Sequence, residues 1–390
     1  MAVNDLTFNQ LSTLLNSIQK QATGQTGIIA TNANEFVTIG QMVLKTGYDT
    51  TLNAISQVLT RTLFSARPYT AKFKGLQVST QRFGNITRKL SIADKDFNDD
   101  DRQKLVEAGS IDQYIVSKPN VLELNFYGAN VYQKSITIFK DQLDQAFNSP
   151  SEFGSFISMV MQNISDQMEQ ARENLARMTV ANFIAGKVEG DTDNVINLLT
   201  EYNTLTGLAL TKADIYKPEN YKDFMQWVNA RINELTGLMT ERSTKFHVNV
   251  TNKVVTRHTP MNKMKVYIHA PFKYGTESRV LADTFHDNYL KLADAEVVNF
   301  WQSIDTPDTI NVKSTYLIAD GTLETAAAAV TTSDVFGVMF DEEALGYTLV
   351  NQWSSPTPFN ARGGYSNIFW HETARYWTDY TENGIVLLMK

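Results

Sequence analysis

The chain has 390 residues, of which 43% are hydrophobic and 20% charged, as is usual for a folded protein with a sizeable core. Its net charge of −7 argues against dedicated binding of nucleic acid, which needs a surplus of Lys and Arg to neutralise phosphate. The absence of cysteine excludes disulfides, thiolate zinc sites and cysteine nucleophiles. No apolar run approaches ~18 residues and the N-terminus lacks a signal-peptide pattern, so we expect neither a membrane span nor a signal peptide.

The N-terminal segment begins with an amphipathic pattern. Residues 4–20 are predicted to form a helix that starts at Asn4 or Asp5 and buries Phe8, Leu11 and Ile18 on one face. A polar stretch rich in Gly and Thr, residues 23–34, is typical of an extended arm or linker. Residues 36–64 return to an apolar periodicity.

The charge of the next segment reverses along the chain. Residues 61–93 contain seven basic residues and no acidic one, whereas residues 94–112 contain seven acidic residues and three basic ones. Much of 69–92 alternates as a β-strand does, with Phe73, Leu76 and Val78 as one example. We therefore expect residues 69–125 to form a long two-stranded excursion.

An isolated hairpin is marginally stable in water, so this excursion needs a surface to rest on. Its two signs of charge favour a second copy of the same protein as that surface, because a basic limb can meet an acidic one. The alternative is a solvated loop whose charges keep it soluble, and the sequence leaves both open.

A long helix is predicted at 149–186, after a strand at 121–140. Ser149 is a suitable cap, Pro150 suits the first helical position, and Gly186 is a stop signal. An apolar stripe repeats at spacings of three and four residues and is expected to be buried. The stripe consists of Phe153, Ile157, Val160, Ile164, Met168, Ala171, Leu175 and Met178. The opposite face, expected to point to solvent or a neighbour, carries Asp166, Gln170, Glu173 and Arg177.

The remaining elements predict an α/β domain followed by a sheet. Residues 219–240 and 276–293 are predicted helices, and 265–270 is a short buried strand, so 190–340 is expected to be a compact domain. The last 50 residues are rich in aromatic residues and predict strands in DVFGVMF, YTLVNQW, NIFWHETARYW and GIVLLM. We expect these strands to pack on the apolar stripe of the long helix.

Catalytic and metal motifs were sought and are absent. HETAR at 371–375 begins like H-E-x-x-H, but Arg375 replaces the second His. Asp94 and Asp96 begin like an EF-hand loop, yet Asp99 replaces its Gly and Leu105 replaces its Glu. We therefore predict no cofactor, no metal and no enzymatic activity, although a distributed active site without a local signature stays open.

The order of these parts resembles the major capsid proteins of tailed bacteriophages, which have the Hong Kong 97-type fold. Some local sequence is similar to short-tailed phages of the picovirus type, namely LTFNQLSTLL, PYTAKFKGLQ, FYGANVYQKSITIFKDQLDQAFNSPSEFGSFISMVMQNI and RYWTDYTENGIVLLM. The resemblance implies an α+β fold with a spine helix at 149–186. The implied parts are an N-terminal arm at 1–65, an extended β-hairpin loop (E-loop) at 66–125, a peripheral (P) domain at 126–189, an inserted axial (A) domain at 190–340, and a return to the P-domain sheet at 341–390.

The resemblance implies a structural function. Subunits would form pentamers and hexamers of an icosahedral shell around double-stranded phage DNA, assembled in the host bacterial cytoplasm and located in the virion. The implied partners are other copies of the chain, a portal, scaffold or head-decoration proteins, and DNA through weak, non-specific contact. Two alternatives are an encapsulin-like cargo compartment and an enzyme with an unrecognised site. The E-loop residues expected at the assembly interface are Arg82, Arg88, Lys89, Asp94, Asp96, Asp99, Asp100, Asp101 and Arg102.

Overall fold

The structure is a computed structural model, and it describes residues 7–24, 28–61, 73–78, 87–93, 106–275 (without 108, 113, 115 and 117) and 295–390. The chain forms two compact units, each made of discontinuous segments. The first unit consists of Met1–Phe83, Ala129–Leu175 and Tyr347–Arg375. The second unit consists of Gly84–Gly128, Ala176–Gly346 and Tyr376–Lys390. The predicted helix 276–293 lies outside the described residues.

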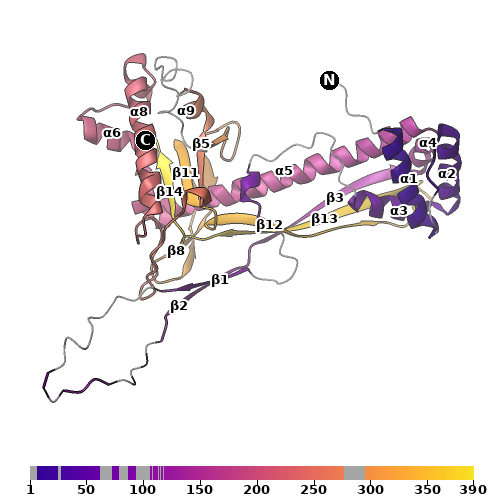
Figure 1. The fold of residues 1–390 in the computed structure, drawn as a ribbon. Helices are drawn as coiled ribbons and strands as arrows, with labels where there is room; N and C mark the ends of the chain where they lie inside the picture. The colour runs from indigo at the N-terminus through magenta and orange to yellow at the C-terminus, as the bar shows by residue number, and fades with distance from the viewer. Residues whose placement is uncertain are drawn as a thin grey trace. The chain divides into compact units, whose positions relative to one another are not determined.

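The first unit combines helices with a three-stranded sheet (Figure 1). Its sheet has the order β12-β13-β3, and β13 pairs antiparallel with β3 from Tyr365↔Phe139 to Arg375↔Ala129. The helix α5, Pro150–Gly190, contributes its residues up to Leu175. The other elements are α1 Phe8–Thr23, α2 Ala33–Lys45, α3 Tyr48–Arg61, η1 Lys74–Leu76, β3 Ala129–Phe139, α4 Lys140–Ala146, β12 Leu345–Pro356 and β13 Tyr365–Thr378.

The core of the first unit confirms the predicted packing of aromatic strands on the long helix. Phe153, Ile157 and Val160 of α5 share one buried cluster with Ile368 and Trp370 of β13. The helix starts as predicted, because the Ser149 hydroxyl accepts a hydrogen bond of 3.2 Å from the backbone N–H of Glu152. The sequence pattern therefore located both the start of the helix and the sheet that covers its stripe.

The N-terminal helices belong to the same core. Side chains of α1, α2 and α3, among them Leu15, Phe36 and Ile55, are buried in the cluster that contains Phe153. The first helix starts later than predicted, with Thr7 as its N-cap. Residues 28–30 connect α1 to α2, and Asn32 caps α2 by accepting from the backbone N–H of Glu35. Over its described residues, the N-terminal segment that was predicted as an arm, residues 1–65, thus contributes folded helices to the first unit.

A hydrogen bond between α3 and β3 makes a pH-dependent contribution to stability. The Tyr48 hydroxyl donates to the carbonyl oxygen of Ile138 at 2.9 Å. Burial, followed by the nearby charge of Asp144, raises the pKa of Tyr48 from 10.0 to about 12. This contribution is fully present below pH 10 and is lost as the pH rises to about 12, because the unfolded hydroxyl ionises first.

We expect Tyr48→Phe to lower the free energy of unfolding by about 0.5–1.5 kcal/mol at neutral pH. The variant should also lose part of the fall in stability seen between pH 10 and 12. Urea unfolding across this range is the measurement, with Tyr127→Phe as control because Tyr127 is 67% exposed. Identical pH profiles for Tyr48→Phe and the wild type would contradict this assignment.

The second unit is built on a five-stranded sheet of order β4-β14-β11-β5-β6, with helices α6 and α8 packed through its core (Figure 1). Its sheet strands are β4 Val195–Asn197, β5 Met264–His269, β6 Glu296–Val298, β11 Val335–Asp341 and β14 Gly384–Leu388. Its helices are η3 Thr192–Asn194, α6 Leu198–Thr206, α7 Lys212–Ile215, α8 Pro218–Thr240, η4 Met261–Lys263 and α9 Ala270–Gly275. Three strand pairs complete it: β1 Thr87–Ile92 with β2 Val121–Phe126, β7 Ile310–Val312 with β10 Val330–Thr332, and β8 Thr315–Leu317 with β9 Leu323–Thr325.

Within this unit the predictions for α8 and β5 are confirmed. The helix starts at Pro218 and buries Tyr221, Phe224 and Val228, and β5 is buried over its last four residues. The four C-terminal strands, however, do not share one sheet. β11 and β14 pair with each other in the five-stranded sheet, whereas β12 and β13 lie in the three-stranded sheet.

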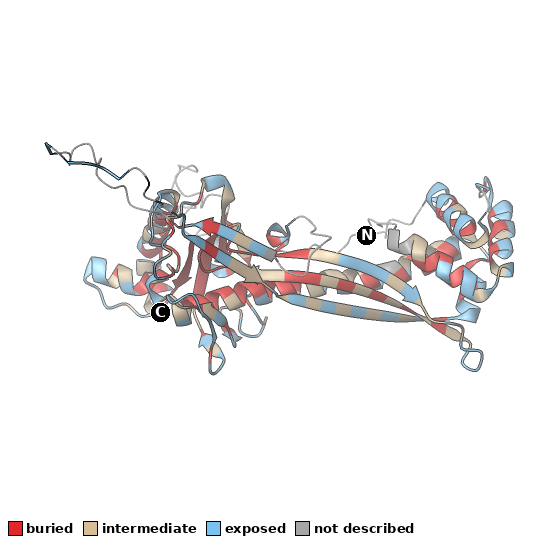
Figure 2. Ribbon diagram, turned by 90° about the horizontal axis from the view of Figure 1, so that it is seen from below, coloured by how far each residue is buried: buried red, intermediate tan, exposed pale blue. Residues whose placement is uncertain are grey.

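The long helix differs from its prediction at its C-terminal end. α5 continues through Gly186 to Gly190. Glu173 and Arg177, which were expected to be exposed, are only 3% and 6% exposed, whereas Met178 of the predicted stripe is 59% exposed. From Ala176 onward the helix is buried on nearly every side within the second unit (Figure 2), as for a helix inside a core. A single apolar stripe therefore describes only its first part.

Two predicted strands are also corrected. Residues 73–78 form the short helix η1 and a bridge from Gln77 to Tyr347 instead of a long strand, with Phe73 and Leu76 buried. The predicted strand 121–140 is two strands, β2 and β3, which belong to different units. An alternating pattern does not reveal that the pairing partner changes along it.

Candidate assembly interface

The predicted E-loop contains a two-stranded ribbon, β1 with β2, which lies in the second unit. The strands pair antiparallel from Thr87↔Phe126 to Ile92↔Val121. Because side chains alternate between faces, the ribbon has an inner and an outer face. The inner face holds the buried Ser91 and Leu122. The outer face carries the exposed Arg88, Leu90, Ile92, Val121 and Glu123.

Arg88 lies on the outer face, as expected of an interface residue, but its charge is compensated within the ribbon. Its guanidinium is 2.7 Å from the carboxylate of Glu123, and the two side chains are 57% and 42% exposed. An exposed pair of this kind contributes about 0–1 kcal/mol. The hydrogen bonds from Arg88, followed by that from Asn125, hold the pKa of Glu123 below its usual value.

Lys89 lies on the inner face and belongs to a buried cluster of charges. Its ammonium is 2.8 Å from Asp379 and 2.5 Å from Glu382, whose side chains are 1% and 7% exposed. Arg257 lies 3.1 Å from Glu382 and donates to the hydroxyl of Ser91 at 2.8 Å. These contacts fix the base of the ribbon to the turn between β13 and β14.

The pKa shifts in this cluster reflect both burial and pairing. Burial opposes the charge of Lys89, but the carboxylates of Asp379 and Glu382 outweigh it and raise the pKa of Lys89. Burial raises the pKa of Glu382 even though Lys89 and Arg257 favour its charged form. The cluster therefore carries the desolvation cost typical of a buried ion pair, which makes it sensitive to the loss of either partner.

The turn at 379–383 is itself entirely buried. Tyr380 donates from its hydroxyl to the carbonyl oxygens of Asn182, at 3.1 Å, and Thr315, at 2.7 Å. Its ring stacks on that of Phe183, with 5.7 Å between centroids. A Cβ on Gly186 would lie 2.0 Å from the Tyr380 hydroxyl, so glycine is required where α5 passes this ring. Gly186 is thus a packing residue rather than a helix stop.

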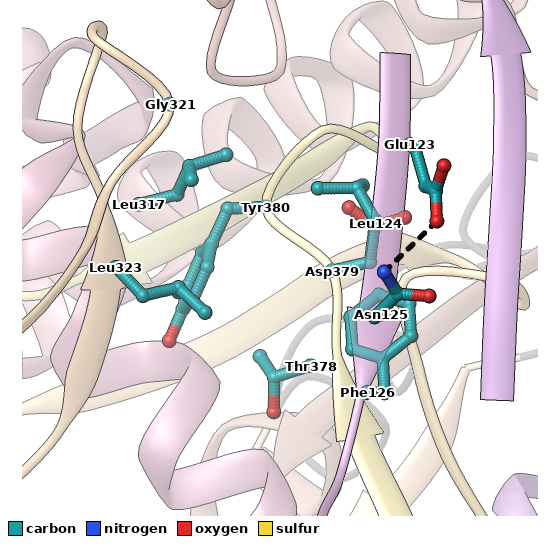
Figure 3. Close-up of a pocket in the computed structure, with 10 residues that line it drawn as sticks. All are labelled: Glu123, Leu124, Asn125, Phe126, Leu317, Gly321, Leu323, Thr378, Asp379 and Tyr380. Atoms are coloured by element: carbon teal, nitrogen blue, oxygen red, sulfur yellow. Dashed lines mark hydrogen bonds between the residues drawn. The ribbon is translucent and has the colours of Figure 1, made fainter. Parts of the chain in front are cut away.

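A pocket of about 180 Å³ lies beside the ribbon base. Figure 3 shows Leu124 and Phe126 of β2 on one side and Leu317, Leu323 and Tyr380 on the other. At its rim, the side-chain amide of Asn125 donates to Glu123 at 3.0 Å. The pocket is lined mainly by apolar side chains.

Of the predicted interface residues, Arg88 and Lys89 are the two that the structure describes. The others, Arg82, Asp94, Asp96, Asp99, Asp100, Asp101 and Arg102, lie outside the described residues. Sequence reasoning missed the apolar part of the outer face, where Leu90 is 58% and Ile92 is 68% exposed. The alternation in TRKLSI contains this signal, since Leu90 and Ile92 share a face with Arg88.

Two further features bear on function. Among the described residues, no group of three or more His, Asp or Glu side chains is placed to hold a metal ion. No helix within the described ranges is long and apolar enough to cross a bilayer.

Comparisons with solved structures show the fold. The capsid structure of Staphylococcus phage Andhra matches 84% of this chain and 87% of its own chain, with a TM-score of 0.57 and 12% identity. A structure described as the head fiber and inner core protein gp22 of native bacteriophage P68 matches over the same shares, with a TM-score of 0.55 and 12% identity. No curated protein matches the chain. The chain has the predicted Hong Kong 97-type α+β fold.

The family is shown by a family model for the Phi29-like phage major capsid protein, which matches residues 15–388. This match covers nearly the whole chain and favours a phage capsid over the encapsulin-like alternative. The chain therefore belongs to the Phi29-like phage major capsid protein family, as a shell-forming structural subunit of the virion capsid.

Proposed function

We propose that this capsid protein assembles into pentamers and hexamers that close into an icosahedral shell around double-stranded phage DNA. Assembly takes place in the host bacterial cytoplasm, and a portal and scaffold or head-decoration proteins are further partners. The protein has no enzymatic role in this proposal. The family match and the capsid fold support it.

The observation that carries the proposal is the ribbon. Its inner face is fixed to its own subunit through Lys89, while its outer face exposes Leu90 and Ile92. A two-stranded ribbon of this kind leaves apolar surface that a further contact can bury. We infer that the ribbon and the limb beyond it, residues 94–118, contact a neighbouring subunit.

Charged residues of the predicted E-loop, within the limb and before it, contribute to this contact by pairing with residues of opposite sign on the neighbour. Arg82, Arg88 and Arg102 supply the basic side, and Asp94, Asp96, Asp99, Asp100 and Asp101 supply the acidic side. Each exposed pair contributes only ~0.2–1 kcal/mol, so strength comes from many simultaneous contacts. Lys89 serves the contact indirectly, because its ammonium already holds the base of the ribbon.

DNA is a weak partner in this account. The net charge of −7 leaves no surplus of cations to neutralise phosphate. The shell therefore encloses DNA without holding it through specific contacts.

Excision of residues 94–119, the limb together with Pro119, tests the role of the limb. The backbone N–H of Ala93 donates to the carbonyl oxygen of Asn120 at 2.8 Å, so a two-residue Asn-Gly turn between these two residues can replace the excised segment and leave β1 and β2 paired. We expect a subunit with wild-type thermal stability that forms no closed shell in negative-stain microscopy. The control replaces residues 319–321, the turn between β8 and β9, by the same Asn-Gly turn, which leaves Ile318 opposite Thr322. Closed shells from the excision variant would refute the interlocking role.

A further inference from the structure

The three-stranded sheet of the first unit has two different faces. On one face, Ile368 and Trp370 of β13 are buried in the core with α5. On the other face, Val131 of β3 is 66% exposed and Trp353 of β12 is 48% exposed. Burial alternates along β13 in the same way, with Ser366, Ile368, Trp370, Glu372 and Ala374 buried and the residues between them half-buried. We call this second face the open sheet face.

The residues of the open sheet face follow from the strand register. Each β3 residue from Val131 to Phe139 on this face pairs directly with a β13 residue from Thr373 to Tyr365. Trp353 joins them because its ring stacks on His371, with 3.9 Å between centroids and 13° between planes. By alternation along β12, Asn351 and Ser355 share this face. The face consists of Val131, Gln133, Ser135, Thr137, Phe139, Asn351, Trp353, Ser355, Tyr365, Asn367, Phe369, His371 and Thr373.

These thirteen residues include no Asp, Glu, Lys or Arg, although such residues make up 20% of the chain. The alternation next reaches Arg375, which pairs with Ala129 and is only 8% exposed. The charges of Lys134 and Glu372 lie on the covered face. There Glu372, only 1% exposed, forms an ion pair of 2.5 Å with Arg172, which also contacts Glu169 at 3.2 Å. A sheet with one solvated face normally has its polar and charged residues outward and its apolar residues inward. The distribution of charge in this sheet is the reverse of the usual one.

The open sheet face is also aromatic. Phe369 lies 6.5 Å from the His371 ring, which in turn stacks on Trp353. At the end of the face, the rings of Phe139 and Tyr365 meet edge to face at 6.0 Å. Depletion of charge together with enrichment of Trp, Tyr and Phe is the composition of the buried centre of a protein–protein interface.

The chemistry of the face restricts what can cover it. DNA is excluded as the main partner because the face has no cation for phosphate. A second copy of this chain fits, because two molecules with a net charge of −7 repel each other least where neither places a charge.

We propose that the open sheet face is an interface buried by a second copy of this chain in the assembled shell. This inference rests on the proposed shell function and adds the surface through which copies meet. The contact is uncharged and rich in aromatic residues, so salt does not weaken it as it weakens the charged contacts of the limb.

The lack of native cysteine permits a direct test of burial in the full chain. Val131→Cys and Thr137→Cys place single thiols on the face, and Ile304→Cys is the control because Ile304 is 75% exposed in the second unit. N-ethylmaleimide labelling is timed on dissociated subunits and on assembled shells. We expect labelling at 131 and 137 to slow at least ten-fold in shells, and labelling at 304 to change less than three-fold. Equal rates in subunits and shells at 131 and 137 would overturn the proposal.

A second set of variants distinguishes direct contact between copies at the open sheet face from simple shielding of this face inside the shell. Val131→Lys and Thr137→Lys should keep the wild-type melting temperature, since both sites are exposed in the subunit, but should reduce shell yield at least ten-fold. Ile304→Lys should assemble normally. Slow labelling combined with normal assembly of the lysine variants would mean that the shell wall merely shields the face, and would overturn the proposal. Failure of the wild type itself to assemble would instead overturn the proposed function.

Discussion

Replacing Lys89 with Met is expected to lower the free energy of unfolding of the subunit by about 3–5 kcal/mol. The variant removes the ammonium that lies 2.8 Å from Asp379 and 2.5 Å from Glu382. Both carboxylates are buried, so they lose a compensating charge without gaining access to water. Urea unfolding of subunits kept too dilute to assemble measures the change.

The neighbouring residue provides a matched control. Arg88→Met also removes one cation from the same strand, but its partner Glu123 is 42% exposed, so the loss should not exceed about 1 kcal/mol. The double variant Lys89→Met/Glu382→Gln should recover part of the stability, because it removes one of the two buried carboxylates that lost the Lys89 ammonium. Equal losses for Lys89→Met and Arg88→Met would show that the buried cluster does not hold the ribbon base.

Gly186→Ala is the second variant with a large expected effect. The test is whether it lowers or raises the free energy of unfolding. Alanine normally stabilises a helix by about 1 kcal/mol relative to glycine. At Gly186 the new Cβ would lie 2.0 Å from the Tyr380 hydroxyl and 2.5 Å from the adjoining ring carbon, Cζ. Because Tyr380 is held by Asn182 and Thr315, we expect a net destabilisation of about 1–3 kcal/mol.

Gly237→Ala is the control for this substitution. Gly237 lies within α8, and no atom lies within 4 Å of the position its Cβ would take. This variant should gain about 0.5–1 kcal/mol. In a Tyr380→Phe background, the destabilisation caused by Gly186→Ala should be smaller than in the wild type, because the closest clashing atom is absent. A Gly186→Ala subunit as stable as the Gly237→Ala subunit would contradict the packing role of Gly186.

The sequence predicted those features that depend on local pattern. Ser149 and Pro150 marked the start of α5, and the spacing of Phe153, Ile157 and Val160 identified the face that packs on β13. The Pro218 start of α8 and the buried strand β5 were predicted for the same reason. Capping and periodicity are properties of a few neighbouring residues, so they can be read without knowing the rest of the fold.

Features that depend on distant partners were not predictable in this way. Glu173 and Arg177 have polar side chains, yet the structure buries both; the Arg177 guanidinium lies 3.8 Å from the centre of the Phe300 ring, 123 residues away. Gly186 has the appearance of a stop signal because its need for space comes from Tyr380. In each case a contact far along the chain overrides the local preference.

The candidate interface shows the same limit. The run of charges indicated where the excursion lies, but only the pairing of β1 with β2 reveals that Arg88 and Lys89 point to opposite faces. The open sheet face could not be predicted from composition, because β3, which ends at Phe139, pairs with a strand that begins only at Tyr365.

Assembly of the purified full-length chain is the measurement that tests this account most directly. Size-exclusion chromatography followed by negative-stain microscopy should show closed particles tens of nanometres across, formed from folded subunits of 43.9 kDa. A stable monomer of that mass that never forms particles, with or without a portal or scaffold protein, would contradict the account.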